Sequence, residues 1–265
     1  MRLSKTLSTA WRERGLLAAC IALALAAFFA PALNQPAGYH AFADHGTWLG
    51  VPHAGDVLSN QPFALFGLAG FWLFWRLPSR TMGNGHRATL NLLFAGLVLT
   101  ALGSTAYHWR PDDAGLVLDR LGMAMALAGV VGLAAAERVS GRAAGFVAVG
   151  ALVAGALAVH AWQATGNLTP WVVCQAGGAV LIAGLACMRE VPGALQVRWL
   201  PVLLAYGLAK AFEASDHAVH EFTAHAISGH TLKHLAAALA VLPVLWAMPR
   251  RPMVGGLSNA CRMHA

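Results

Sequence analysis

Charged residues are scarce in this chain of 265 residues, at 11% of the sequence, whereas hydrophobic residues make up 58%. This balance is far from that of soluble globular proteins. Cysteine is scarce as well: the four cysteines form no CxxC pair, which argues against both a disulfide framework and a thiolate zinc site. The sequence shows no internal repeat and no long linker, so we expect one membrane domain.

Apolar stretches long enough to cross a membrane recur along the chain. Alternating ten-residue segments, which are typical of a lipid-facing barrel, do not occur in the sequence, so the stretches are expected to be helices. The eight predicted spans lie near residues 15–33, 57–76, 88–109, 114–136, 143–163, 170–188, 198–220 and 226–247. The sequence therefore predicts an all-α membrane protein.

The net charge of +7 comes from basic residues that gather in particular loops. Of the 18 Lys and Arg residues, 14 lie before the first span, in every second loop or after the last span. The alternate loops hold only Arg110. This is the positive-inside pattern for eight spans with both termini in the cytoplasm. The basic charge is thus explained by orientation in a membrane, and no nucleic-acid partner is expected.

The first span is open to a second interpretation, as a cleaved signal sequence, because a basic start and an apolar run precede the small residues around Pro31 and Ala32. Retention is favoured, because the apolar run is long for a signal peptide. The predicted segments are then a cytoplasmic segment (1–14), an extra N-terminal transmembrane helix (15–33), a seven-helix domain (34–248) that starts with an outer loop (34–56), and a cytoplasmic tail (249–265).

Several polar residues fall inside the predicted spans, where they are costly and therefore indicate function. His230 and His234 are four residues apart, which places both imidazoles on one face of the last span. Ser104 and His108 have the same spacing in the third span, and Asp119 follows a short turn. All five lie within one or two turns of an outer helix end, so we expect them in one layer in the outer half of the membrane.

Other polar residues have simpler interpretations. Asp119 could form an ion pair with its neighbour Arg120, and Ser104 by itself could be a packing residue. Lys210 and Glu213 are one turn apart and are expected to pair with each other. Ser59 and Asn60 are expected to cap the second span. Four histidines taken singly are best explained as interfacial residues at helix ends: His160, His217, His220 and His225.

Three imidazoles, a carboxylate and a hydroxyl are the parts of a catalytic zinc site with one open position. Zinc bound by His108, His230 and His234 would lower the pKa of a water molecule to about 7. Asp119 could accept a proton from this water, and Ser104 could hydrogen-bond the water or the developing oxyanion. A site at this depth suits a lipid substrate whose amide or ester lies near the headgroup.

The pattern Ser104-x3-His108, Asp119 and His230-x3-His234 resembles the CREST superfamily of membrane hydrolases, which includes the alkaline ceramidases and the progestin/adipoQ receptors. The segments 39–63 and 208–240 look like bacterial members of the alkaline ceramidase branch, and the resemblance runs from about residue 39 to residue 246. It implies a seven-helix core with an intramembrane zinc bound by the three histidines, and Asp119 and Ser104 in contact with the zinc-bound water. The implied reaction is hydrolysis of ceramide or a ceramide-like N-acyl lipid to a fatty acid and an amine.

Two features depart from this resemblance. The first span is extra to the seven-helix core, so the expected fold is seven plus one. Animal alkaline ceramidases carry an acid-rich, calcium-binding stretch before the segment that corresponds to the second span, where this chain offers only Asp44 and Asp56. Calcium regulation is therefore not expected.

The identity of the natural substrate stays open between ceramide and another N-acyl amino-lipid, because both fit the same chemistry.

Three other classes of protein use similar residues. Transmembrane redox proteins bind haem through histidines on facing helices, which an i,i+4 pair suits poorly. A retinal protein would use Lys233 with Asp119 as counter-ion, but Lys233 is expected to point about 100° away from His230 and His234 on the helix. A progestin/adipoQ-type receptor usually has the inverted topology. We therefore favour a hydrolase in a bacterial inner membrane, with its site toward the periplasm and a lipid as its partner; its oligomeric state is open.

Overall fold

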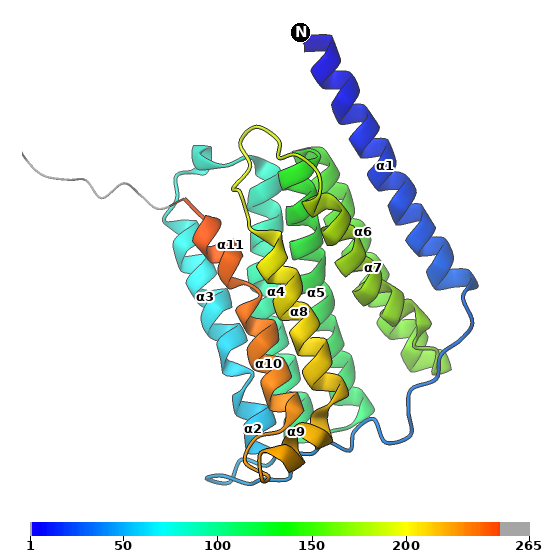
Figure 1. Ribbon diagram of the computed structural model, residues 1–265, viewed down its shortest axis with the longest axis vertical. Helices are drawn as coiled ribbons and strands as arrows, with labels where there is room; N and C mark the ends of the chain where they lie inside the picture. Colours follow the sequence, from blue (N-terminus) through cyan, green and yellow to red (C-terminus); the bar gives the residue numbers. More distant parts are fainter. Residues whose placement is uncertain (1, 250–265) are drawn as a thin grey trace, which may run out of the picture.

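The computed structural model describes residues 2–249, and helices are the regular elements in this part of the chain. In order they are α1 (Arg2–Phe29), α2 (Ala54–Leu58), α3 (Gln61–Trp75), the short 3-10 helix η1 (Ser79–Thr81), α4 (Asn84–Trp109), α5 (Asp113–Arg138), α6 (Gly141–Thr165), α7 (Thr169–Ala186), α8 (Trp199–Ala214), α9 (Asp216–Phe222), α10 (Gly229–Leu239) and α11 (Leu242–Ala247). Most of them run along the long axis of one bundle (Figure 1). The predicted cytoplasmic tail lies outside the described residues, apart from its first residue.

Six helical segments among the described residues are long and apolar enough to cross a membrane. They are Ala54–Trp75, Asn84–Trp109, Asp113–Arg138, Gly141–Thr165, Thr169–Ala186 and Gly229–Ala247. The chain is therefore an all-α integral membrane protein. The remaining two of the eight expected spans correspond to α1 and to α8 with α9. Helix α1 carries Arg12, Glu13 and Arg14 in its first half, and α8 has only 16 residues. The count of eight stays a prediction.

Three of the expected spans are interrupted helices. The second is divided into α2 and α3, the seventh into α8 and α9, and the last into α10 and α11. Pro62 and Pro243 lie in the first turns of α3 and α11, where a missing backbone N–H costs no helical hydrogen bond. Asn60 occupies the N-cap position of α3, as expected, but its side chain makes no capping hydrogen bond to the helix. Ser59 and Asn60 both donate instead to the carbonyl oxygen of Asp56, at 3.1 Å and 2.8 Å.

The centre of the bundle is the closely packed pair α4 and α5. At Gly103 an added Cβ would lie 2.6 Å from the carbonyl oxygen of Leu118. At Gly96 it would lie 2.2 Å from the amide nitrogen of Ala126. Small residues allow transmembrane helices to approach in this way. The approach places the end of α4, with Ser104 and His108, beside the start of α5.

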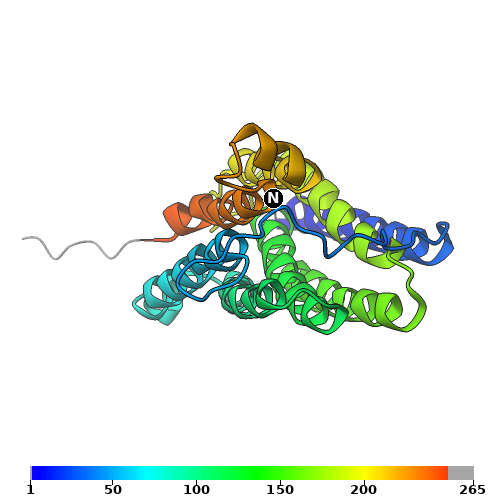
Figure 2. The same cartoon turned by 90° about the horizontal axis from the view of Figure 1, so that it is seen from below.

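Helix α1 lies at the side of the bundle beside α7 (Figures 1 and 2). It is one continuous helix that joins the predicted cytoplasmic segment to the predicted extra span. In the first half of α1, Arg12 donates to the carbonyl oxygens of Arg138 and Arg189, at 2.9 Å and 3.1 Å. Glu13 forms an ion pair with Arg142 at 2.5 Å. These contacts join α1 to the ends of α5, α6 and α7.

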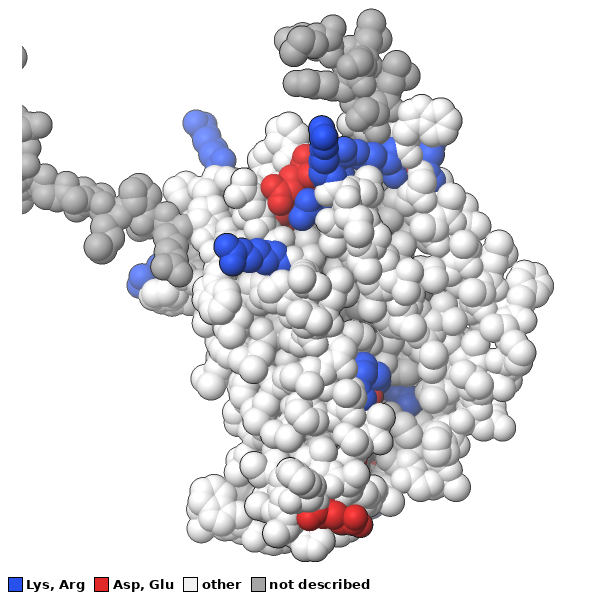
Figure 3. Space-filling model, viewed as in Figure 1, with Lys and Arg blue, Asp and Glu red and all other residues white. Residues whose placement is uncertain are grey.

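Most of the Lys and Arg side chains in view gather at one end of the molecule (Figure 3). The predicted orientation requires this arrangement, because it needs the basic loops on one side of the membrane. A buried carboxylate connects the helices at the same end. Glu137 accepts hydrogen bonds from His86 Nε2 at 2.9 Å and from the backbone N–H groups of Leu195 and Val197, at 2.5 Å and 3.1 Å. We call these four residues the Glu137 cluster.

Candidate metal centre

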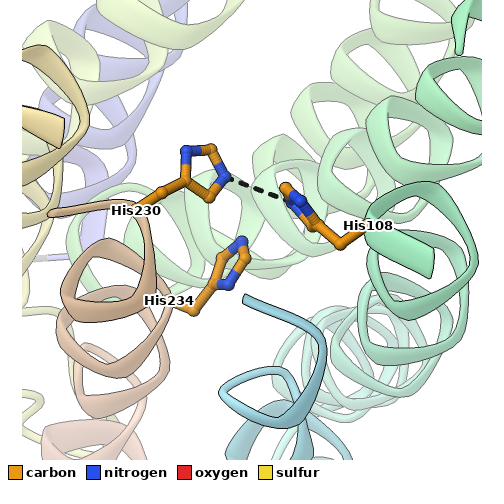
Figure 4. A group of neighbouring side chains, drawn as sticks. All are labelled: His108, His230 and His234. Atoms are coloured by element: carbon orange, nitrogen blue, oxygen red, sulfur yellow. Dashed lines mark hydrogen bonds between the residues drawn. The ribbon is translucent and has the colours of Figure 1, made fainter. Parts of the chain in front are cut away.

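Three histidines meet at the end of the bundle opposite the Glu137 cluster. His108 comes from the last turn of α4, and His230 and His234 come from one face of α10. All three side chains are buried, and one nitrogen from each lies within 4.8 Å of the other two. Figure 4 shows the three rings turned toward one another from facing helices. The predicted meeting of these residues is thus found in the structure.

The spacing of the imidazoles suits a metal ion. The Nε2 atoms of His108 and His230 are 3.1 Å apart. Two nitrogens on one tetrahedral zinc, each about 2.0–2.1 Å from the metal, are separated by about 3.3 Å. Without a shared metal or proton, two neutral imidazoles gain little from turning their lone pairs toward each other. The cluster can therefore hold a metal ion; zinc is compatible with the donor set and stays a prediction.

A second contact selects the tautomer of His234. Its Nδ1 lies 2.9 Å from the hydroxyl oxygen of Ser59, and that hydroxyl donates to the Asp56 carbonyl oxygen. Because the hydroxyl proton is used by Asp56, Ser59 accepts the Nδ1–H proton of His234. The Nε2 lone pair of His234 is then available for a metal. Such outer hydrogen bonds commonly orient histidine ligands.

The start of α10 is anchored by carboxylates from two other segments. Asp56 Oδ1 accepts hydrogen bonds from the hydroxyls of Ser228 and Thr231, at 2.8 Å and 2.7 Å. Asp216 Oδ1 accepts the backbone N–H of His230 at 2.7 Å. Ser228 also caps the helix by accepting the N–H of Thr231 at 2.9 Å. The position of both α10 histidines therefore depends on residues of α2 and α9.

The segment before α2 covers the centre. The ring of Phe42 lies over His108 and His230, with centroid distances of 4.6 Å and 4.4 Å. Asp44 accepts the N–H groups of Gly46 and Asp56, at 2.9 Å and 3.0 Å, and so shapes the loop. The two acids considered for calcium in the sequence are both engaged by donors of the protein itself. This cover shields the imidazoles from water on that side.

Ser104 and Asp119 lie beside the histidine cluster. The Ser104 hydroxyl lies near the Asp119 carboxyl group, and both residues are buried. Together with His234 they line one cavity of about 180 Å³. Most of the remaining wall consists of apolar side chains from α3, α4, α5, α7, α8, α10 and α11. Chemically reactive groups are therefore collected in the wall of an apolar space inside the bundle.

Arg120 is directed away from its neighbour Asp119. Its guanidinium group lies 4.1 Å from the ring centre of Trp162 and donates to the side chain of Gln35 at 3.0 Å. An ion pair between Asp119 and Arg120 does not occur among the described contacts. The alternative of a structural pair therefore gains no support, and the Asp119 carboxyl group is available to the cavity.

Lys233 departs from the expected direction. Its ammonium nitrogen lies 3.1 Å from His230 Nε2, although its Cα is rotated about 100° from that of His234. The prediction that Lys233 points away from the histidines is wrong, because a flexible four-carbon side chain reaches back across the helix face. The predicted pairing of Lys210 with Glu213 is confirmed, and Lys233 joins the same carboxylate at 3.0 Å.

The four histidines interpreted as interfacial residues do not enter the centre. His217 contacts the carbonyl oxygen of Ala41 at 3.0 Å, and the rings of His220 and His225 lie 4.9 Å apart. His160 is exposed. Sequence reasoning missed the anchoring roles of Ser59, Asp56 and Asp216. The only local sign of these roles in the sequence is that each is a short polar residue close to an interruption of a helix.

No family model matches the chain, and no curated protein and no solved structure matches it either. The chemistry of the site therefore has to be argued from its own residues.

Proposed function

We propose that this protein is a zinc-dependent intramembrane hydrolase that cleaves the amide bond of an N-acyl lipid, ceramide or a ceramide-like lipid, to a fatty acid and an amine. One observation carries the proposal: Ser104, Asp119 and His234 line the same cavity, whose other walls are mostly apolar. An apolar space accepts an acyl chain, and the polar residues then meet the linkage at its end. The reaction class follows from the combination of an imidazole cluster, a carboxylate and a hydroxyl.

Each residue has a defined task in this reaction. Zinc, when bound by the three imidazoles, supplies a Lewis acid and favours ionisation of water. Asp119 accepts a proton from the attacking water, whose oxygen bonds to the carbonyl carbon. Ser104 donates a hydrogen bond to the carbonyl oxygen as that oxygen gains negative charge. The C–N bond then breaks, Asp119 returns the proton to the leaving nitrogen, and a carboxylic acid and an amine result.

The residues that carry the resemblance to the alkaline ceramidases are the ones gathered here, which supports a place for the chain in that branch of the CREST superfamily. The haem alternative fits the geometry less well. The three ring centroids lie 4.6 to 4.9 Å apart, so no porphyrin fits between imidazoles in this arrangement. A receptor of the progestin/adipoQ type differs in topology, which makes orientation the discriminating measurement.

Lipid mass spectrometry tests the reaction directly. Membranes from cells that express the wild-type chain are compared with membranes that contain equal amounts of Asp119→Asn protein. We expect N-acyl lipids to fall and free fatty acids and amines to rise only with the wild-type chain. An identical amide-lipid content in the two membranes would count against a hydrolase.

We further propose that both termini face the cytoplasm and that the metal centre faces the periplasm, on the strength of the basic loops. Dual reporters fused after Ala265 report on the side of the C-terminus. A cytoplasmic reporter should be active and an exported one inactive. The reverse result would favour the inverted topology of the receptor alternative.

A further inference from the structure

Two lysines share one carboxylate at the edge of the cavity. Glu213 of α8 pairs with Lys233 of α10 at 3.0 Å and with Lys210 of its own helix. We call these three residues the lysine cluster. One carboxylate between two ammonium groups leaves an excess of one positive charge within the cluster. The Asp119 carboxylate in the wall of the same cavity also acts on Lys233. Once Asp119 has accepted a proton in the proposed reaction, the excess charge in this largely apolar bundle favours a further anion.

The lysine cluster extends from the metal centre toward the surface of the bundle. Lys233 lines the cavity, and its side chain is only 13% exposed, whereas Glu213 is 25% and Lys210 45% exposed. Gln175 of α7 accepts a hydrogen bond from Lys210 at 3.4 Å. Figure 3 shows Lys or Arg side chains, with a little acidic surface beside them, at a hollow in the middle of the face in view. Positive charge therefore extends from the cavity wall to the surface of the bundle.

The distance from the lysine cluster to the metal centre limits which anion it can hold. The Lys233 ammonium lies 3.1 Å from His230 Nε2, a nitrogen of the candidate metal site. If one substrate molecule places an anionic group on this ammonium and its scissile amide at the imidazoles, the two groups are therefore only a few covalent bonds apart. The apolar part of the cavity takes the acyl chain, so the anion belongs to the amine side of the scissile amide. In an N-acyl α-amino acid, the carboxylate is two bonds from the amide nitrogen.

We propose that the lysine cluster binds a substrate carboxylate, and that the preferred substrates are long-chain N-acyl α-amino acids in place of neutral N-acyl amino alcohols. This inference rests on the proposed function and names its substrate class. Lys233 makes the direct contact with the carboxylate. Glu213 positions Lys233, and Lys210 contributes the second positive charge nearer the surface.

A matched pair of lipids tests this specificity. N-palmitoyl glycine and N-palmitoyl ethanolamine differ only in a carboxylate in place of a hydroxymethyl group. With the full-length protein in detergent, kcat/KM should be about 10–100-fold higher for the glycine amide, because hydrogen bonds to charged groups are the stronger ones. Lys233→Gln should abolish this preference. Lys210→Gln should reduce it by a smaller factor, because Lys210 is more exposed to screening.

The readout is the ratio of the two kcat/KM values, which a general loss of activity does not change. Metal content is measured in every variant to verify that the centre is intact. Arg80→Gln removes one positive charge from an exposed residue in the connection between α3 and α4. It should leave the ratio unchanged. Equal kcat/KM for both lipids in the wild-type protein would overturn the inference and leave the hydrolase proposal standing.

Equilibrium binding separates the two proposals if neither lipid is hydrolysed. Tighter binding of palmitoyl glycine by calorimetry, lost in Lys233→Gln, would support the carboxylate site and count against hydrolysis. Equal binding of both lipids would overturn the site. Palmitate is the third probe. If palmitate binds as tightly as palmitoyl glycine and is weakened equally by Lys233→Gln, the cluster holds the carboxylate of the product, and the substrate assignment is overturned.

Discussion

The Glu137 cluster and the metal centre are both buried polar groups in one bundle, and α4 and α5 contribute residues to each. In the Glu137 cluster, both carboxylate oxygens accept hydrogen bonds from the protein. At the metal centre, His108 Nδ1 has no hydrogen-bond partner among the described residues, and two Nε2 atoms face each other. A cavity lies beside the metal centre, whereas the Glu137 cluster joins helix ends and a loop.

The difference indicates which buried polar residues serve stability and which serve chemistry. Buried polar groups in proteins are normally satisfied by hydrogen bonds, so a complete set of partners is typical of a structural role. Imidazole nitrogens that converge on one point, next to a space for a ligand, are typical of a site.

The largest difference should come from the histidines. His230→Ala should lose the bound metal and all hydrolytic activity, because only two imidazoles remain as ligands. His86→Ala, in the Glu137 cluster, should keep the metal and lower the melting temperature. Metal content by mass spectrometry and thermal unfolding in detergent provide the two readouts. Full metal retention by folded His230→Ala protein would exclude His230 as a ligand.

The buried carboxyl groups make the second matched pair. Asp119→Asn should keep the metal and lower amide hydrolysis by about 10²–10⁴-fold, as loss of a general base does. Glu137→Gln replaces one of the two accepting oxygens by an NH₂ group that faces a backbone N–H, and should lower the free energy of unfolding by about 1–3 kcal/mol. Its turnover per folded molecule should be normal. Normal turnover by well-folded Asp119→Asn protein would remove Asp119 from the mechanism.

Removal of the Ser104 hydroxyl, next to Asp119, is expected to cause a smaller loss of activity. Ser104→Ala should retain the metal and lose about 10²-fold in kcat, the effect of one oxyanion-type hydrogen bond. Thr89 is the control, because its hydroxyl donates to the Gly85 carbonyl oxygen of the same helix and lies near the Glu137 cluster. Thr89→Val should leave kcat unchanged. Equal kcat values for Ser104→Ala and wild type would show that Ser104 only packs.

The mildest effect concerns the residue that orients His234. Ser59→Ala removes the acceptor for the Nδ1–H proton, and metal affinity should fall about 10–100-fold, as for other outer-shell partners of histidine ligands. Competition with a chelator measures this affinity at equilibrium. A metal affinity identical to that of the wild-type chain would mean that the contact does not select the tautomer.

The membrane-spanning helices and the histidine cluster were within reach of sequence reasoning, because their signals are local. Hydrophobic length is a property of each segment, and the i,i+4 spacing of His230 and His234 places two ligands on one helix face. Counting turns from the predicted outer ends put His108 and Asp119 at a similar depth. The interruptions at residues 59–60, 215 and 240–241 were missed, because apolar composition continues across them.

The direction of Lys233 shows the limit of such reasoning. Its angular position on α10 predicted divergence from the histidines, yet the ammonium group reaches His230 and Glu213. A helix position determines where Cα lies, whereas a long side chain ends where its partners are. Glu213 is the partner that attracts it, and it comes from a different helix.

The sequence alone therefore determined that this protein consists of membrane helices, and that the pairs Ser104 with His108 and His230 with His234 lie at one depth. Hydrophobic length and i,i+4 spacing can each be recognised within a single segment of the chain. Only the tertiary structure decided which helix faces meet, because this depends on contacts between distant residues. Gly103 lets α4 approach α5, and Ser59 and Asp56 reach α10 across about 175 and 172 positions of the chain. Such contacts leave no periodic signal in the sequence, and they are the ones that turn three histidines into a site.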